Sequence, residues 1–431
     1  MNKKILLLNP PGKFRYLRDY YCSSISKAGY YWHPIDLLIL SGYLHEKYEI
    51  NVIDCIAESL NADDCYNRIK EIVPDVVIFL SSVLSYEEDI QFIKRIKELK
   101  NIKTIGCGEI FLQAPHKTLA DNPHVDAVIL DFTNKDILDF IEYSSRYDNI
   151  LPFGKNYGEY FRIPLPRHEK FPLSRYRYPC SRSHPFASVL TNYGCPYKCH
   201  FCNSGNLGFK IREIDNVIGE LKYIKELGIS QIFIKDMTFG ADREHALEFC
   251  KAIVKEGVEI QWNCYARIDT VDEELIRYMK EAGCYLIQFG IENIDDKLTE
   301  KYGKKIAISR VNEVFKMLRK QKILTGAHFL FGLPEEPAGS AKESMAFSRK
   351  IRPDYVSYNI YSPRKGSSLA AQAPAGQNSQ LRNCINKGYF RFYLRPGYIF
   401  SRLSKIRSFY ELKNLLYMGK MLASNIIKDR I

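Results

Sequence analysis

Short apolar runs alternate with helix-like segments along most of the chain, and this alternation constrains the fold more than any other feature. In the first 145 residues, apolar and often β-branched runs recur at 4–9, 50–54, 76–80, 104–106 and 125–130. Segments of helical periodicity separate them at 35–47, 62–72, 87–99 and 135–143. Apolar strands joined by helices predict a doubly wound parallel sheet of the flavodoxin or Rossmann type.

The second half repeats the pattern with six strand-like runs, at 186–193, 231–236, 259–266, 285–292, 324–333 and 355–361. Helical segments follow at 214–227, 244–255, 273–281, 309–321 and 340–350. Six such units predict an incomplete, TIM-like (β/α)6 parallel barrel with its chemistry at the carboxyl ends of the strands. We therefore divide the α/β chain into a doubly wound domain (1–145), a proline-rich linker (146–185), the barrel (186–375) and a basic, aromatic, helical C-terminal extension (376–431).

Three cysteines in one loop directly after the first barrel strand point to a metal centre. Cys195, Cys199 and Cys202 have the spacing C-x3-C-x2-C, and no fourth cysteine lies close by in the sequence. Because structural metal sites use four protein ligands, three thiolates leave one coordination position open. The preceding Gly194 lets the loop turn tightly. Zinc bound with His200 and inert buried thiols are the alternatives, but ligand spacing of this kind favours a metal site.

The cysteine loop resembles the signature of radical S-adenosylmethionine enzymes, including the aromatic Phe201 before the third cysteine. The resemblance implies that the three thiolates are catalytic ligands of a 4Fe–4S cluster. The fourth iron would then bind the amino and carboxylate groups of S-adenosylmethionine, with Tyr197 and Phe201 beside this cofactor.

Polar residues at the ends of the following strands complete the cofactor site that the resemblance implies. Asp236 would accept hydrogen bonds from the ammonium group, and Arg267 would contact the carboxylate in a two-point geometry. Glu292, in a Gly-Ile-Glu sequence, would bind the ribose or the sulfonium side. Gly332 and Leu333 form the turn that would face adenine.

Structural roles are the alternative for these charged residues. The two acids could be helix N-caps, and Arg267 could form an ion pair with Asp269 or Asp272. Their shared order behind the cysteine loop favours the cofactor site.

The first domain resembles the cobalamin-binding domain that precedes the barrel in one large subgroup of these enzymes. The resemblance rests on residues at three strand ends: Asn9 and Pro10, Ser82 and Leu84, Gly106 and Gly108. Small residues are expected there because a corrin ring and its nucleotide tail must lie against bare backbone. An unrelated flavodoxin-like domain would also carry small residues at its strand ends.

The chain departs from the cobalamin pattern in three places. The D-x-H-x-x-G signature, whose histidine ligates cobalt, is missing, although His33 lies in the corresponding segment. Cys107 interrupts the usual pair of glycines, and the sequence 131–134 replaces a common Gly-Glu-x-Glu. These changes bear on how cobalt is ligated and on the shape of the nucleotide pocket.

The resemblance implies a radical reaction. One electron cleaves S-adenosylmethionine to methionine and a 5′-deoxyadenosyl radical, which removes hydrogen from an unactivated carbon. With methylcobalamin present, the substrate radical would take its methyl group. We therefore predict a cobalamin-dependent methyltransferase that acts on an sp3 carbon of a small molecule, lipid or natural product.

Other functions remain open at this stage. A radical cyclase, oxidoreductase or carbon–carbon bond-forming enzyme could have the same architecture. A tRNA methylthiotransferase would normally carry a further cysteine triad near its amino terminus, whereas Cys22, Cys55, Cys65 and Cys107 are dispersed. A non-enzymatic iron–sulfur protein is the last alternative.

The net charge of +12 is concentrated at the end of the chain. Residues 387–431 hold ten Lys and Arg against two acids, interleaved with aromatic residues. This pattern fits a helical tail that packs its aromatic side chains and solvates its charges, or one that contacts a membrane surface or an anionic ligand. We do not expect a nucleic acid partner.

The compartment and the redox partner follow from the cysteines and from the reaction. Twelve cysteines in 431 residues are no disulfide scaffold, and the sequence has neither a signal peptide nor an apolar run of membrane length. We therefore expect a cytoplasmic protein that works under anaerobic conditions with a flavodoxin- or ferredoxin-type electron donor.

Overall fold

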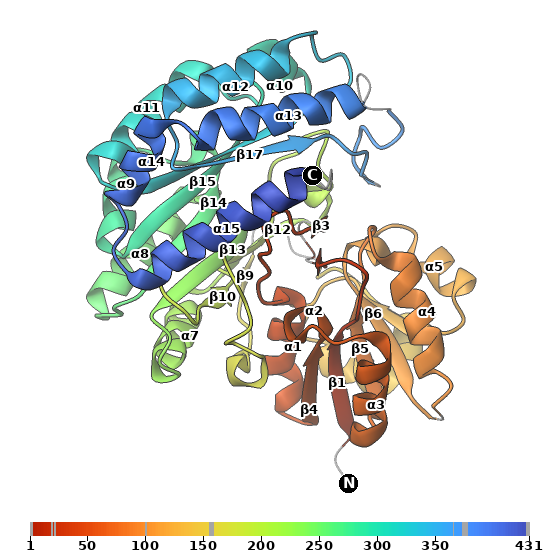
Figure 1. Ribbon diagram of the computed structural model, residues 1–431. Coiled ribbons are helices and arrows are strands. Elements are labelled where there is room, and N and C mark those ends of the chain that lie inside the picture. Colours follow the sequence, from red (N-terminus) through yellow and green to blue (C-terminus); the bar gives the residue numbers. More distant parts are fainter. Residues whose placement is uncertain are drawn as a thin grey trace.

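The chain forms two α/β units that lie side by side, with helices from the C-terminal end running along the second unit (Figure 1). The computed structural model describes residues 3–18, 20, 23–99, 101–154, 159–364, 366–372 and 378–427. Cys22 and the charged residues at 428–430 lie outside these ranges.

The first unit contains a six-stranded, wholly parallel sheet of order β4-β1-β5-β6-β7-β8. Its strands are β1 (Lys4–Asn9), β4 (Glu49–Asp54), β5 (Val76–Leu80), β6 (Lys103–Cys107), β7 (Ala127–Ile129) and β8 (Ile150–Leu151). Every residue of β5 is buried, as the continuous apolar runs predicted. The sheet continues past residue 145 because β8 pairs with β7, within the stretch predicted as a linker.

Helices cover both faces of this sheet, so the doubly wound fold is confirmed. They are α1 (Ile35–His45), α2 (Cys55–Glu58), α3 (Ala62–Ile72), α4 (Tyr86–Ile96), α5 (Pro115–Asp121) and α6 (Ile137–Tyr143), with 3-10 turns η1 (Glu109–Leu112) and η2 (Ser144–Tyr147). A short hairpin of β2 (Tyr16–Leu17) and β3 (Ser24–Ile25) follows β1. The reversal of strand order between β1 and β5 places the carboxyl ends of these strands beside a crevice.

The second unit is the predicted partial barrel, with six parallel strands paired in sequential order. These are β10 (Ala187–Val189), β13 (Gln231–Phe239), β14 (Gln261–Ala266), β15 (Cys284–Glu292), β16 (Leu324–Phe331) and β17 (Tyr355–Ile360). The outer helices are α7 (Ile214–Glu226), α8 (Arg243–Lys255), α9 (Glu273–Glu281), α10 (Asp296–Lys301), α11 (Ile308–Lys320) and α12 (Ser340–Ile351), with 3-10 turns η3 (His168–Lys170), η4 (Ser204–Asn206) and η5 (Ile268–Thr270). In the described part of the chain, β10 and β17 do not pair, so the barrel is open between them.

The predicted single strand at 186–193 is two strands. After β10 the chain turns into β11 (Asn192–Gly194), which pairs antiparallel with β12 (Phe209–Arg212). The strand β9 (Tyr160–Phe161) joins this small sheet from the linker. The division has a tertiary cause, because Asp236 of β13 binds the backbone N–H groups of Thr191 and Asn192 at the turn. The sequence carries no local signal for that contact.

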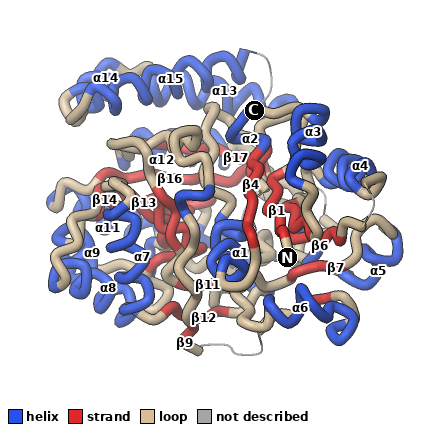
Figure 2. The backbone as a smooth tube through the Cα atoms, turned by 90° about the horizontal axis from the view of Figure 1, so that it is seen from below, coloured by secondary structure: helices blue, strands red, loops and turns tan. Residues whose placement is uncertain are grey.

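The C-terminal extension is helical, as predicted, and comprises α13 (Asn378–Tyr393), α14 (Pro396–Leu403) and α15 (Phe409–Ile427). The three helices lie together along one side of the molecule (Figure 2). The Tyr389 hydroxyl accepts a hydrogen bond from the backbone N–H of Tyr358 in β17. The Asn414 side chain donates to the backbone oxygen of Tyr178. The extension therefore packs across the open side of the barrel; the exact domain boundaries stay a prediction.

Candidate functional site

The cysteine loop follows β11 at the carboxyl edge of the barrel, and its conformation depends on Gly194. This residue has a φ of +78°, and a Cβ atom there would lie 2.0 Å from the backbone oxygen of Gly208. The same oxygen accepts a hydrogen bond from the N–H of Cys195 at 3.0 Å. Because L side chains disfavour this region of φ and the space is filled, only glycine allows the loop to begin here.

The three thiols are half-buried, and polar or cationic groups surround them. Cys199 Sγ lies 3.6 Å from a guanidinium nitrogen of Arg267, and Cys202 Sγ accepts a hydrogen bond from the N–H of Ser204 at 3.4 Å. Burial raises the pKa of the Cys195 and Cys199 thiols, whereas Arg267 and Lys304 favour the Cys199 thiolate. This donor set fits an iron–sulfur cluster, because cations beside the thiolates offset its negative charge.

The cysteine loop is not arranged to bind a single metal ion such as zinc. Within the described ranges, no three His, Cys, Asp or Glu side chains converge closely enough to hold one ion. Ligand sulfurs around one tetrahedral zinc lie about 3.8 Å apart. A four-iron cube is larger and accepts thiolates that are further apart, so this result concerns single-ion sites alone.

The two aromatic residues of the loop line the predicted cofactor site in different ways. The Arg267 guanidinium lies 3.9 Å from the centre of the Tyr197 ring, which fixes both side chains. Phe201 is partly buried and packs against a small apolar cluster that shields one side of the loop. The members of this cluster are Leu298, Tyr302, Leu333, Tyr361 and Leu369.

Arg267 forms one of the two ion pairs that the sequence left open. Its Nε and Nη2 atoms lie 2.8 and 2.7 Å from the two carboxylate oxygens of Asp269. The remaining nitrogen points toward Cys199. Asp269 therefore orients the guanidinium toward the cysteine loop, and the predicted contact of Arg267 with a cofactor carboxylate stays a prediction.

Glu292 ends β15 in a strained conformation beside a lysine. Its φ is +65°, a left-handed conformation that non-glycine residues seldom adopt, and such outliers gather at functional sites. Its carboxylate pairs with Lys304 Nζ at 2.5 Å, and both side chains are largely buried. Lys304 is a site residue that the sequence analysis missed, since it lies in a loop after α10 without a motif of its own.

Asp236 is fully buried beneath the cysteine loop. Its carboxylate accepts hydrogen bonds from the backbone and side chains of Thr191 and Asn192. Burial raises its pKa to about 6. Four donors already use the acceptor capacity of this carboxylate, so an ammonium group would have to replace one of them. The geometry therefore shows Asp236 fixing the chain that leads into the loop.

The turn at Gly332 and Leu333 is held by an acid. The backbone N–H groups of both residues donate to Glu336 Oε2, and the other oxygen of Glu336 accepts from Asn293. Ser340 in turn donates to Asn293. Glu336 follows Leu333 of the predicted turn by three residues, a spacing at which a carboxylate can accept from backbone N–H groups.

At the carboxyl edge of the first sheet, a buried arginine organises the residues predicted to bind cobalamin. Arg18 forms a fully buried ion pair with Asp89 at 2.7 Å. It also donates to the Asn9 side chain at 2.9 Å and to the backbone oxygen of Pro10 at 2.7 Å. Ser82 is buried nearby and shares a hydrogen bond with Ser85. No motif in the sequence marks Arg18 or Asp89, because their side chains come from distant parts of the chain.

The two glycines of this edge leave room for groups of the protein itself, and their predicted contact with cobalamin stays a prediction. A Cβ atom at Gly106 would lie 2.5 Å from the Phe111 ring, and one at Gly108 would lie 2.2 Å from the backbone oxygen of Ser81. The protein's own groups therefore occupy the space that these glycines leave. His33 lies near this edge and lines a small cavity together with Asn9 and Arg18, but it is fully buried and its Nδ1 bonds to Ser188.

The two carboxyl edges meet at a hollow of about 110 Å³. One side carries Val83 and Leu84, which are about half exposed, and Glu109. The other side carries Asn203, which directly follows Cys202, and Arg364, whose guanidinium lies 3.5 Å from Glu109. The half-exposed side chains of Val83 and Leu84 fit contact with a flat ring.

Two family models match the chain at these sites. The model of the radical SAM superfamily matches residues 189–347, which include the cysteine loop and the strand ends from β13 to β16. Residues 189–347 therefore form a radical SAM domain. The B12 binding domain model matches residues 23–135, which cover most of the first unit. The protein is therefore a radical SAM enzyme with the architecture of the cobalamin-dependent methyltransferases.

Similar proteins agree with this architecture. An uncharacterized methyltransferase of Pyrococcus horikoshii, PH0819, is 26% identical, covering 91% of this chain and 93% of its own. The cytidylyl-2-hydroxyethylphosphonate methyltransferase of Streptomyces wedmorensis is 25% identical, covering 90% and 82%. The radical SAM methyltransferase TsrM of Kitasatospora setae, solved with cobalamin and a [4Fe-4S] cluster, has a TM-score of 0.66 and 18% identity, covering 86% and 77%.

The family determines what the enzyme requires. Its cofactors are a 4Fe–4S cluster, S-adenosylmethionine and cobalamin, and it needs an electron donor and a substrate. No helix in the described ranges has the length and hydropathy of a membrane span. The assignment of individual residues to each cofactor stays a prediction.

Proposed function

We propose that this enzyme transfers a methyl group to an unactivated sp3 carbon. One observation supports this reaction above others: Asn203, which directly follows the cysteine loop, lines the same hollow as Val83 and Leu84 of the first unit. A substrate carbon at this position would lie between the cluster side and the cobalamin side. Both cofactors would then reach one atom in turn.

When bound, the cofactors supply a carbon radical and a methyl group. The side chains of the protein hold the cofactors in position and stabilise their charges. We assign the thiolates of Cys195, Cys199 and Cys202 to the cluster, and Arg267 and Lys304 to the stabilisation of negative charge beside it. Phe201 and its apolar neighbours exclude water from one side of the loop.

Further parts of the proposal concern the partners. A flavodoxin- or ferredoxin-type protein would deliver the electron, and the cytoplasm would keep the thiols reduced. The proposed cofactor contacts are Tyr197, Glu292 and the turn at Gly332 for S-adenosylmethionine, and Leu84 for cobalamin.

Anaerobic reconstitution tests the proposal. Protein loaded with iron and cobalamin is reduced in the presence of S-adenosylmethionine that is deuterated in its methyl group, together with candidate substrates. We expect 5′-deoxyadenosine and a product that carries the labelled methyl. Cys195→Ala should lose iron and cleavage, whereas Cys384→Ala, a half-buried cysteine of α13, should keep both. Deoxyadenosine without any labelled product would refute methyl transfer.

A radical reaction without methyl transfer is the second candidate, and one observation favours it. Phe111 fills the space beside Gly106, where the resemblance predicted bare backbone for the nucleotide tail. If purified protein retains no cobalamin after reconstitution, a cyclase or oxidoreductase becomes the better assignment.

A further inference from the structure

We propose that the substrate is a large, uncharged, apolar molecule drawn from an anionic bilayer, and that it enters the barrel between the C-terminal helices. The proposal rests on the radical function proposed above and specifies the substrate class of the same site. It follows from an apolar cavity, from the residues at its inner end, and from the surface around its mouth.

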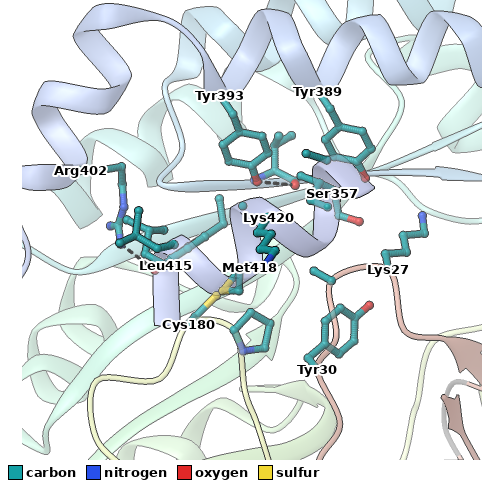
Figure 3. Close-up of a pocket in the computed structure, with 18 of the residues that line it drawn as sticks. Lys27, Tyr30, Cys180, Ser357, Tyr389, Tyr393, Arg402, Leu415, Met418 and Lys420 are labelled. Atoms are coloured by element: carbon teal, nitrogen blue, oxygen red, sulfur yellow. Dashed lines mark hydrogen bonds between the residues drawn. The ribbon is translucent and has the colours of Figure 1, made fainter. Parts of the chain in front are cut away.

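A cavity of about 550 Å³ lies at the open side of the barrel, within the range of pockets that bury drug-sized ligands. Four separate parts of the chain enclose it: residues 27–32, residues 178–180, strands β14 to β17, and helices α13 to α15. Tyr389 and Tyr393 lie on one side of the cavity, and Cys180 and Tyr30 lie on the opposite side (Figure 3). The extension thus forms a wall of the cavity.

The inner end of this cavity lies below the cofactor site. His328 of β16 lines the cavity and is in register with Gly290, two residues before Glu292. Two residues of strand span about 7 Å. The charges of Glu292 and Lys304 act on His328, which is consistent with this proximity. A molecule in the cavity would therefore present one end to the predicted cofactor site.

Several polar groups at the inner end and along the walls are engaged within the protein. The His328 ring bonds to Gln288 at 3.1 Å, and Lys27 donates to the Tyr358 backbone and to Asn359. Arg402 lies 3.6 Å from Asp354 and bonds to the Tyr355 hydroxyl. Asp354 offsets the charge of Arg402, although Nε and Nη1 of Arg402 have no hydrogen-bond partner among the described residues, and Lys420 lies at the exposed side of the lining. Because most lining residues are apolar, the cavity favours an uncharged apolar occupant.

The mouth of the cavity opens between the C-terminal helices. Five apolar residues line the cavity and are also exposed to solvent: Phe390, Leu394, Ile399, Leu403 and Leu416. Phe400 and Phe409, on the same helices, are 76% and 81% exposed. Such a concentration of exposed apolar side chains around a cavity mouth indicates a surface that meets an apolar phase.

The charged side chains around the mouth indicate which kind of apolar phase this surface meets. Within 379–427, the exposed charged side chains are all basic: Lys387, Arg391, Lys405, Arg407, Lys413 and Lys420. The acid of this stretch, Glu411, is buried. Exposed apolar side chains flanked by bases are typical of helices that lie on anionic bilayers. This surface therefore fits an anionic membrane, from which an apolar substrate enters the adjacent mouth.

The first test concerns the cavity. Trp32 lines it, whereas Trp262, the second tryptophan of the chain, is buried in the barrel core. Dibromohexadecanol, an apolar quencher, should saturably quench the Trp32 emission of the full-length protein. Ala423→Phe narrows the cavity and should weaken binding at least fivefold, whereas Ser424→Phe, beside it on α15 and not in the lining, should leave binding unchanged. Absence of saturable quenching, or equal effects of the two variants, would overturn the cavity assignment.

The second test concerns the membrane. The protein should float with vesicles of phosphatidylglycerol and phosphatidylcholine at low salt, and not with pure phosphatidylcholine. Phe400→Ser with Phe409→Ser should lower the partition coefficient at least tenfold, while Val254→Ser, a half-exposed residue of α8, should not change it. Failure to bind anionic vesicles would overturn the membrane source.

A third measurement separates this proposal from the function on which it rests. Cleavage of S-adenosylmethionine to deoxyadenosine is followed in the same reconstituted samples without substrate. Cleavage together with failure of the quenching or flotation test refutes the substrate class and leaves the radical function intact. Loss of cleavage in fully loaded protein refutes the radical function itself.

Discussion

Replacement of Gly194 by alanine should release the cluster while leaving the fold intact. The left-handed conformation costs alanine about 1–2 kcal/mol. Its Cβ would lie 2.0 Å from the Gly208 oxygen, so that oxygen must move and its hydrogen bond to Cys195 is lost, at about 0.5–1.5 kcal/mol. The loop conformation that gathers the thiols is thus penalised by about 1.5–3.5 kcal/mol, and cluster retention should fall by roughly 10- to 300-fold.

Iron per chain after anaerobic gel filtration, together with the visible absorbance of the cluster, measures this loss. The thermal midpoint of the apoprotein reports the fold separately. Gly219→Ala is the matched control, because Gly219 lies within α7 and a Cβ there meets no atom within 4 Å. Alanine should stabilise that helix by about 0.5–1 kcal/mol and leave the iron content unchanged. Full iron loading of Gly194→Ala would refute the reasoning.

Two further predictions concern the layer beneath the cofactor site. Lys304→Met leaves Glu292 buried without its partner, which should lower the free energy of unfolding by about 3–5 kcal/mol; an unchanged urea midpoint would contradict this. Burial lowers the pKa of His328 to about 4. The charges of Lys304 and Lys27 also lower this pKa, whereas the charge of Glu292 raises it. The unfolded state therefore binds more protons between pH 6.5 and 4, and stability falls by about 3 kcal/mol as the pH drops through this window. In a plot of urea midpoint against pH, His328→Gln should show a smaller decrease between pH 6.5 and 4 than the unchanged protein. Parallel curves for the variant and the unchanged protein would argue against this prediction.

The predicted elements agree with the structure wherever the pattern is local and continuous. The run at 76–80 became β5 and the predicted strand at 285–292 became β15, because strands covered on both faces are mostly apolar. The strand predicted at 186–193 failed because its interruption depends on Asp236, more than forty residues away. The sixth strand of the first sheet, β8, was missed because two residues in a proline-rich stretch carry no periodicity.

In the predicted site, too, local patterns could be predicted from the sequence and contacts between distant residues could not. The sequence predicted that the cysteines and the acids at strand ends lie near one another, because parallel strands bring their carboxyl ends to one edge. The sequence did not predict the roles of Lys304, Arg18 and Phe111. Each of these residues contacts a residue that no motif connects with it.

The sequence by itself determined the chemistry of this protein: the spacing of three thiols, and the two periodicities that build a doubly wound sheet and a partial barrel. These are local properties, set by bond lengths, side-chain type and the pitch of strands and helices. The tertiary structure alone decided which groups face one another. It placed the cysteine loop beside the edge of the first sheet, and it enclosed an apolar cavity with four separate parts of the chain. Such contacts depend on how whole elements pack, and packing is not written in any short stretch of residues.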